Sequence, residues 1–287
     1  MKILTFDIED WFHLLDHEST ASVESWHRYP SRVREGVDRL LDLLRERDTR
    51  ATFFCLGWVA ERYPDVIRAI DEAGFHIGTH SYAHQLAYQQ SAADFREDLR
   101  RSIGILEEIT GKRIDCYRAP GFSITAENLW VFEILIEEGI RVDCSLFAAE
   151  RAHGGVPQLR VERPAVGDWN GTEIKVFPMN TRSILGKRLV YSGGGYFRLF
   201  PGFLLDKWLT QDDYVMTYFH PRDFDPDQPV LPDLGAVRRF KSYVGLGGAR
   251  KKLEWILRNH HFIDLPEAMQ QVDWSAAPRT DLKAAAS

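Results

Sequence analysis

Apolar residues follow two alternating patterns in the first half of the chain. Short runs rich in β-branched and aromatic residues are typical of buried strands, and stretches with an apolar residue at every third or fourth position are typical of amphipathic helices. Strands followed in turn by helices indicate a parallel sheet, so we expect an α/β fold. The predicted strands span residues 2–6, 51–56, 75–78, 114–117 and 140–142, and the predicted helices span 33–44, 58–73, 91–110 and 125–138.

The second half of the chain has a less regular pattern. Residues 151–172 carry the glycines and prolines of a loop, and the glycine run at 193–195 predicts a close approach of the backbone to a ligand or to the rim of a barrel. We expect one domain over 1–274 and a disordered tail over 275–287. Further strands are predicted at 173–177, 214–219 and 262–265, with an irregular loop at 221–233 and a helix at 248–259.

Polar clusters follow several of the predicted strands. In open α/β sheets and barrels, ligands bind at the carboxyl ends of the strands. We therefore expect these clusters to meet at one site, although each residue alone could instead be a cap, an ion pair or a packed core residue. The clusters lie at 5–10, 78–84, 117–121 and 218–221.

His80 and His84 are the strongest candidates for metal ligands. On one turn of helix, side chains at i and i+4 share a face, and two neutral imidazoles held in this way can bind one divalent ion. An acid would be the third ligand. Glu9 shares a strand face with Asp7, whereas Asp10 is favoured if the chain has already turned, so both acids stay candidates.

These clusters resemble, in order, the five motifs of the NodB-type polysaccharide deacetylases of carbohydrate esterase family 4. The acids after the first strand resemble the first motif, and 80–84 fits the HSxxH motif closely. Residues 118–120 fit the RxP motif, and 142–145 and 219–220 resemble the last two. The resemblance covers roughly 1–270 and is greatest to the branch associated with exopolysaccharide and O-antigen loci. It implies a distorted (β/α) barrel with about seven parallel strands.

The resemblance also implies roles for individual residues. Asp7 would be the base that takes a proton from water, and Arg118 would orient it. His220 would protonate the departing amine, and Asp143 would stabilise the imidazolium form of His220. The ion would be zinc, with cobalt or nickel as alternatives.

The third motif departs from the family pattern at one position. The family usually has RxPYG, and a backbone N–H at the fourth position helps to hold the oxyanion. Here Gly121 follows Pro120 at that position and is itself followed by Phe122. Gly121 keeps the N–H, since every residue except proline has one. The change from Tyr-Gly to Gly-Phe after Pro120 is therefore expected to alter the shape of the pocket wall.

Composition limits the partners and the location. The 287 residues are 44% apolar and 27% charged with a net charge of −6, so no basic bias indicates nucleic acid. Three separate cysteines without a CxxC pair predict buried thiols. The N-terminal residues predict no signal peptide, and the sequence predicts no apolar stretch long enough to span a membrane, so we expect a cytoplasmic protein.

The sequence therefore predicts a metal-dependent hydrolase that removes N-acetyl groups from N-acetylated hexosamines of a polysaccharide or glycan precursor. Three alternatives stay open. One is a related amidohydrolase, similar to the allantoinase-like branch, that acts on a non-glycan C–N bond. Another is a glycosidase, which paired carboxylates would suit. The last is a barrel that binds sugar without turnover.

Overall fold

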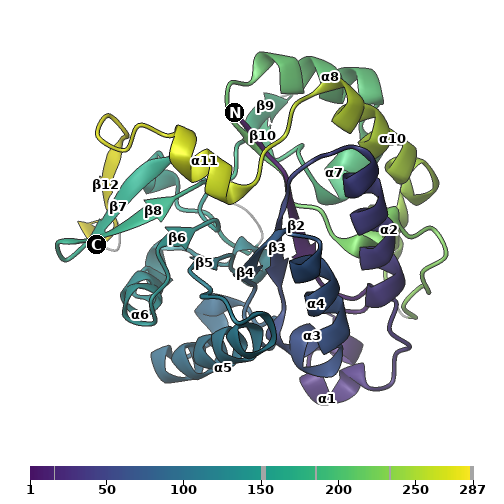
Figure 1. The fold of residues 1–287 in the computed structure, drawn as a ribbon, viewed down its shortest axis with the longest axis horizontal. Coiled ribbons are helices and arrows are strands. Elements are labelled where there is room, and N and C mark those ends of the chain that lie inside the picture. The colour runs from purple at the N-terminus through teal and green to yellow at the C-terminus, as the bar shows by residue number, and fades with distance from the viewer. Residues whose placement is uncertain (16, 150–152, 185, 233, 285–287) are drawn as a thin grey trace.

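A computed structural model describes residues 1–15, 17–149, 153–184, 186–232 and 234–284 (Figure 1). Its central element is an eight-stranded sheet in which only the pair β7 and β8 is antiparallel. The sheet has the order β12-β7-β8-β6-β5-β4-β3-β2. Its strands are β2 (Thr5–Ile8), β3 (Thr52–Cys55), β4 (His76–Thr79), β5 (Cys116–Tyr117), β6 (Val142–Asp143), β7 (Ala165–Trp169), β8 (Thr172–Val176) and β12 (Arg279–Asp281).

The sheet curves so that late parts of the chain lie beside its first strand. The strand β1 (Lys2–Ile3) leads into β2 and pairs in parallel with β11 (Val215–Met216). Parallel bridges also join Phe6 to Phe219 and Ile3 to Ile263. Every residue of β2 and β3 is buried, as expected for a parallel strand covered on both faces. The predicted distorted α/β barrel is confirmed.

The amphipathic segments form helices on the outside of the curved sheet (Figure 1). They begin and end where local chemistry requires: Ser91 accepts a hydrogen bond from the N–H of Asp94 at the start of α5, and Gly111 ends α5 with a φ of 65°. Pro64 begins α4, where a proline costs no hydrogen bond. The helices of this half are α1 (Val23–Trp26), α2 (Val33–Glu46), α3 (Gly57–Arg62), α4 (Pro64–Glu72), α5 (Ala92–Thr110) and α6 (Val131–Glu137).

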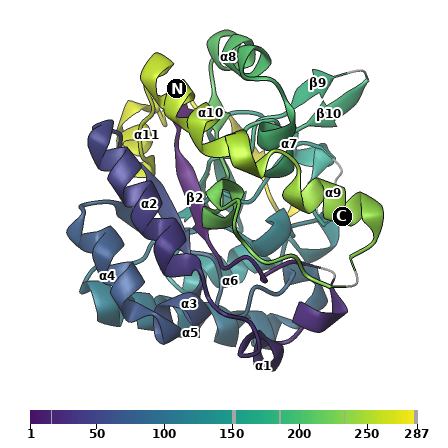
Figure 2. The ribbon, with the colours of Figure 1, turned by 90° about the vertical axis from the view of Figure 1, so that its right-hand side faces the viewer.

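The second half is more helical than its sequence pattern predicted. The glycine run begins a helix, α7, and two further helices precede the predicted one at 248–259 (Figure 2). A two-stranded hairpin stands beside them. These elements are β9 (Arg182–Ile184), β10 (Lys187–Leu189), α7 (Gly194–Leu199), α8 (Gly202–Gln211), α9 (Ala236–Tyr243), α10 (Leu246–Asn259) and α11 (Leu265–Gln271).

Three predictions for this half were wrong. The segment 151–172, predicted as a loop, contains β7, and the predicted strand at 262–265 makes only the bridge from Ile263. The tail predicted as disordered from 275 contains β12, which pairs with β7 and is followed by the fully buried Leu282. The last three residues of that predicted tail lie outside the described residues. This segment is ordered by apolar contacts with residues that are distant in the sequence, and composition alone could not indicate such contacts.

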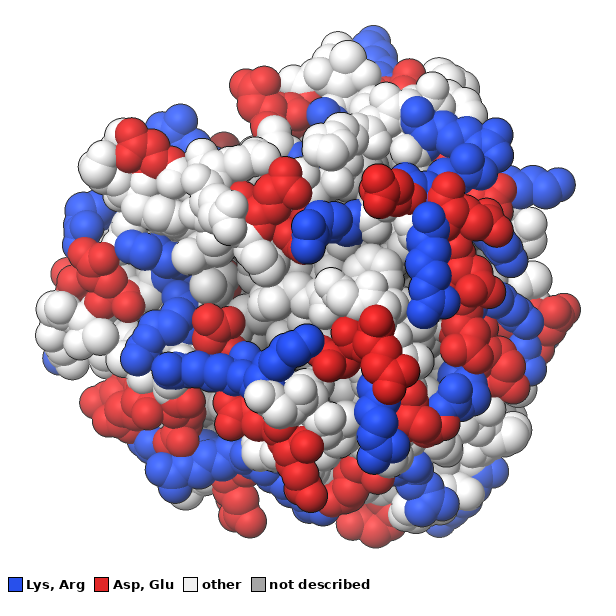
Figure 3. Space-filling view, viewed as in Figure 1, with Lys and Arg blue, Asp and Glu red and all other residues white. Residues whose placement is uncertain are grey.

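Charge is spread rather than gathered on the face seen in Figure 3, where acidic and basic side chains are interspersed. Within the described residues, no helix combines the length and the apolar character needed to cross a membrane. The three cysteines Cys55, Cys116 and Cys144 are buried free thiols, as predicted.

Candidate metal and catalytic site

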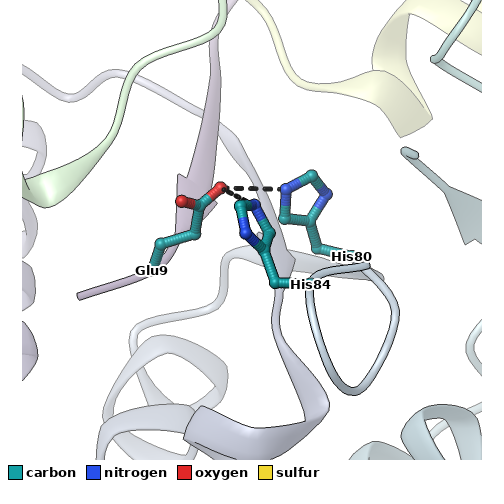
Figure 4. A group of neighbouring side chains, drawn as sticks. All are labelled: Glu9, His80 and His84. Carbon is teal, nitrogen blue, oxygen red and sulfur yellow. Dashed lines mark hydrogen bonds and ion pairs between the residues drawn. The ribbon is translucent and has the colours of Figure 1, made fainter. Parts of the chain in front are cut away.

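Glu9, His80 and His84 meet at the carboxyl ends of β2 and β4 (Figure 4). The Oε1 atom of Glu9 lies 3.0 Å from Nε2 of His80 and 2.9 Å from Nε2 of His84. All three side chains are buried. Two imidazoles and one carboxylate, with ligand atoms this close, form a donor set that suits a divalent metal ion.

The two histidines converge through a loop and not through a helix. The sequence analysis placed His80 and His84 on one helical turn, but 80–84 has no helical structure. Ser81 and His84 have φ values of 67° and 52°, which are left-handed backbone conformations. The carboxylate of Asp98 accepts two backbone N–H groups of this loop at 2.8 Å each. Asp98 therefore stabilises a loop conformation that helical spacing could not predict.

Asp10 lies outside the metal-ligand group. It accepts hydrogen bonds from the hydroxyl of Ser31 and from the backbone N–H groups of Trp11 and Arg32. These bonds place its carboxylate at the entry to α2. Of the two acids that the sequence left open, the structure places Glu9 beside the histidines and uses Asp10 to hold the chain before a helix.

The hydrogen bond made by His80 tests whether these residues fit a metal ion. Its Nδ1 lies 2.8 Å from the carbonyl oxygen of Arg118, so Nδ1 carries a proton and donates it. In the neutral ring, Nε2 then presents a lone pair toward the carboxylate of Glu9. Two acceptors face each other in this arrangement, and a cation between them would satisfy both. The site therefore fits a divalent ion.

Asp7 and Arg118 form a buried ion pair beside this group. The Nη1 atom of Arg118 lies 2.7 Å from Oδ1 of Asp7 and donates another bond of 2.7 Å to the hydroxyl of Thr5. The guanidinium also lies 4.2 Å from the centre of the Phe54 ring. These contacts fix the carboxylate of Asp7 through one oxygen, and its other oxygen, Oδ2, lies 3.9 Å from Nε2 of His220.

His220 has a different acidic partner from the one predicted. Its Nδ1 lies 3.0 Å from Oδ2 of Asp223, one turn further along the chain. The other oxygen of Asp223 lies 3.2 Å from the guanidinium of Arg198 on α7. The buried side chains of Arg198 and Asp223 thus lead to the half-buried ring of His220 and direct its Nε2 toward Glu9, at 3.7 Å, and toward Asp7.

Asp143, which the sequence analysis assigned to His220, has another place in the structure. It is fully buried at the end of β6, and its Oδ2 accepts the backbone N–H of Ser145 at 3.0 Å. Burial raises its pKa to about 6. The assignment to His220 was wrong because the loop after His220 turns back and supplies its own carboxylate, which a motif order cannot show.

The charges around His220 favour its protonated form. Burial acts against a charged imidazole, but the carboxylates of Glu9, Asp223 and Asp7 outweigh it and raise the pKa of His220 to about 9. Burial likewise opposes the charge on Asp223, yet Arg198 and His220 hold the pKa of that carboxyl at about 2. The pair is therefore an imidazolium and a carboxylate near neutral pH, which suits a proton donor.

The proposed site forms a cleft of about 330 Å³, whose lining includes Asp7, Glu9, His80, His84, His220 and Asp223. Gly121 and Phe122 form part of its wall with positive φ values of 59° and 55°. Pro120 is buried beneath the wall and is not among its lining residues. Gly194 and Gly195 also line the cleft, and a Cβ atom on Gly193 would lie only 2.1 Å from the carbonyl oxygen of Tyr218. The close backbone approach predicted for the glycine run is confirmed.

His13 is a residue of this cleft that the sequence patterns did not single out. Its Nδ1 accepts the backbone N–H of Asp10 at 3.1 Å, so Nε2 carries the proton. That buried Nε2 has no hydrogen-bond partner among the described residues. Burial, together with the nearby His84, holds the pKa of His13 well below its usual range. A neutral donor therefore borders the cleft.

The residues that the sequence missed come mostly from the second half of the chain. Asp223 lies three positions after His220, the spacing at which a carboxylate can reach back to a preceding side chain. That spacing was a usable signal. Arg198 follows the glycine run, and only the fold brings it to Asp223, so no local pattern could have identified it.

Comparison with known proteins separates the same two halves. The sequence model of the family described as "Polysaccharide deacetylase" matches residues 4–135, and that of "Domain of unknown function (DUF3473)" matches residues 144–270. A peptidoglycan deacetylase of Helicobacter pylori is 30% identical over 111 residues, which are 39% of this chain and 37% of that protein. The chain thus spans well under half the length of this curated relative.

Two solved structures are similar over nearly the whole chain. A putative polysaccharide deacetylase from Mycobacterium smegmatis has a TM-score of 0.65 at 20% identity, covering 97% of this chain and 92% of that chain. The structure of PuuE allantoinase has a TM-score of 0.58 at 18% identity, covering 94% and 88%. At these identities the likeness shows the fold, which two different activities share.

Proposed function

We propose, from the match of residues 4–135 to the polysaccharide deacetylase family model, that the chain is a metal-dependent deacetylase. Its substrate would be an N-acetylated hexosamine in a polysaccharide or a glycan precursor. The observation that carries the proposal is the convergence of the three buried metal-ligand side chains with Asp7 and His220. The exopolysaccharide or O-antigen setting and the cytoplasmic location expected from the sequence stay predictions.

Glu9, His80 and His84 would hold the ion. Their two imidazole nitrogens and one carboxylate oxygen favour zinc, with cobalt or nickel as alternatives. A divalent ion at such a site supplies a positive charge that acidifies water and polarises the amide carbonyl. Three protein ligands leave room for water and substrate, as in catalytic zinc sites.

Asp7 is the proposed base. Arg118 holds its Oδ1, which leaves Oδ2 to accept the proton of the attacking water. As the water oxygen bonds to the acetyl carbon, the carbonyl gains negative charge. The backbone N–H of Gly121, in the wall of the cleft, is the proposed donor to that oxygen.

His220 is the proposed acid. Its protonated Nε2 gives a proton to the amine nitrogen as the C–N bond breaks, which releases acetate and a free hexosamine amine. Asp223 accepts the hydrogen bond from Nδ1 and so directs Nε2 into the cleft. Asp7 and His220 together supply one acceptance and one donation of a proton, which balances the hydrolysis.

The test is acetate release by the purified chain from N-acetylchitooligosaccharides. After removal of metal with a chelator, we expect no release, and we expect recovery on addition of one equivalent of zinc. Acetate release separates this function from a glycosidase, which would instead produce new reducing ends. Absence of acetate from the zinc-loaded chain with every N-acetylated glycan tested would overturn the proposal.

A further inference from the structure

A second and larger hollow opens from the catalytic cleft. It has a volume of about 1350 Å³, against about 330 Å³ for the cleft itself. Gly195, Tyr218 and Lys241 line both spaces, so the two adjoin. The hollow is built from α7, α9, the β9–β10 hairpin and the loop before β7, all in the second half of the chain (Figure 2). A substrate held in the cleft can therefore extend into it.

The hollow has a mainly apolar lining, part of which is open to solvent. On α9, Val237 is 70% exposed and Phe240 is 57% exposed, and Leu199 at the end of α7 is 47% exposed. None of the residues of α9 is buried, although the helix has an apolar and a basic face. Apolar surface costs free energy in water, and a patch of this kind beside a cleft marks a place where an apolar group binds.

Basic residues stand among these apolar residues. Arg160, Arg188 and Lys241 line the hollow together with one acid, Glu162, which pairs with Arg188. The lining therefore has an excess of positive charge although the whole chain has a net charge of −6. Lys241 stands at the junction with the catalytic cleft. An anionic group would bind there, between whatever occupies the cleft and whatever occupies the hollow.

The lining offers few acceptors to the hydroxyls of a long glycan. Among the described lining residues Glu162 is the only carboxylate, it pairs with Arg188, and none carries a side-chain amide. Three aromatic rings lie among the aliphatic side chains of the lining, those of Tyr196, Tyr218 and Phe240. This mixed apolar lining is the kind of surface that a hydrocarbon chain covers.

We propose that the hollow binds the phosphate and hydrocarbon chain of a lipid-linked sugar, of the polyprenyl-phosphate class. The sugar would enter the catalytic cleft, the phosphate would lie at Lys241, and the chain would lie along Leu199, Val237 and Phe240. The inference rests on the proposed deacetylase function for the sugar. It deepens that function, because it assigns the substrate to a glycan precursor that still carries its lipid.

The test measures the binding of decyl phosphate, at concentrations below micelle formation, to the metal-loaded chain by calorimetry. Inorganic phosphate and decanol are the two partial probes. We expect decyl phosphate to bind at least about tenfold more tightly than either, since it alone contacts both the basic and the apolar lining. Equal binding of all three probes, or no binding of decyl phosphate, would overturn the proposal.

Variants of residues that line the hollow test whether decyl phosphate binds there. Phe240→Ser and Val237→Ser should each weaken decyl phosphate binding several-fold, and Lys241→Met should weaken it without changing decanol binding. Phe203→Ser is the matched control, because Phe203 is 69% exposed on α8 and outside the hollow. An equal loss in the control would contradict the proposal. Binding to phosphatidylglycerol vesicles without binding to decyl phosphate would assign the surface to a membrane and also overturn it.

The two proposals fail in different ways. Binding of decyl phosphate requires no turnover, so it is measured independently of acetate release. Decyl phosphate binding without any acetate release would overturn the deacetylase function and support the hollow. Acetate release from soluble oligosaccharides without decyl phosphate binding would do the reverse.

Discussion

The two halves of this molecule build their parts of the site in different ways. Residues 4–135 supply Asp7, Glu9, His80, His84 and Arg118, all at or just beyond the ends of strands in one parallel sheet. Residues 144–270 supply Arg198 from α7, and His220 and Asp223 from the start of a short 3-10 helix, and they also form the apolar hollow. The first half thus fixes the proposed metal ligands and the proposed base on a rigid scaffold, and the second half surrounds them with the proposed proton donor and substrate contacts.

The largest expected effect comes from removing a ligand of the first half. Glu9→Gln, His80→Ala and His84→Ala should each lose most bound zinc and reduce acetate release to background, since each removes one of three protein ligands. The fold should survive because the backbone hydrogen bonds that join the strands of the sheet do not involve these three side chains. Metal analysis and circular dichroism of each variant check this. Full zinc retention in all three would contradict the ligand assignment.

The next largest effect tests the base. Asp7→Asn should keep normal zinc content while kcat falls about 10²- to 10⁴-fold, because proton abstraction is lost but the ligands remain. Asparagine also keeps a hydrogen bond to Arg118, so the local structure is retained. If zinc content fell in parallel with activity, Asp7 would be a metal ligand, and its assignment as the base would be wrong.

The third prediction addresses the second half through Asp223. His220 must be protonated to act, so activity is lost as pH rises through its raised pKa of about 9. Asp223→Asn removes one of the charges that raises this pKa, and the alkaline limb of the pH–rate profile should move to lower pH by about one unit. Asp143→Asn is the matched control and should leave the alkaline limb in place. A shift in the control alone would restore the assignment made from the sequence.

The contrast between the halves also explains what the sequence could and could not predict. Asp7 lies near the end of the buried strand β2, Arg118 and the histidine pair follow β5 and β4, and periodicity locates strand ends. The choice between Glu9 and Asp10 depends on where the chain turns after β2, which no pattern specifies. The side chain of Asp10 turns away from the histidines because Ser31 and the backbone before α2 donate hydrogen bonds to its carboxylate. Those contacts are between residues that are far apart in the sequence.

In the second half, the sequence pattern predicted fewer of the helices and strands correctly, because these elements are short and depend on each other for their structure. α7 is a single short helix after a glycine run, and β12 forms only by pairing with β7. Arg198 reaches Asp223 across the fold. Such contacts depend on packing and not on local propensity, so the acidic partner predicted for His220 was wrong.

The smallest expected effect is on stability. Asp10→Ala should retain zinc and activity but lower the free energy of unfolding by about 1–3 kcal/mol, the usual cost of leaving buried hydrogen-bond donors without their acceptor. Denaturant unfolding with metal analysis of the same sample measures both quantities. Loss of zinc with unchanged stability would show that Asp10 is a ligand.

The most direct test of the account is an anomalous difference map at the zinc edge from crystals of the zinc-loaded chain. We predict one peak about 2.0–2.2 Å from Oε1 of Glu9 and from Nε2 of His80 and His84. Asp10 should remain hydrogen-bonded to Ser31 in the same crystals. A peak coordinated by Asp10 or by His220 in place of Glu9 would contradict the account, as would fully zinc-loaded protein with no peak between the histidines.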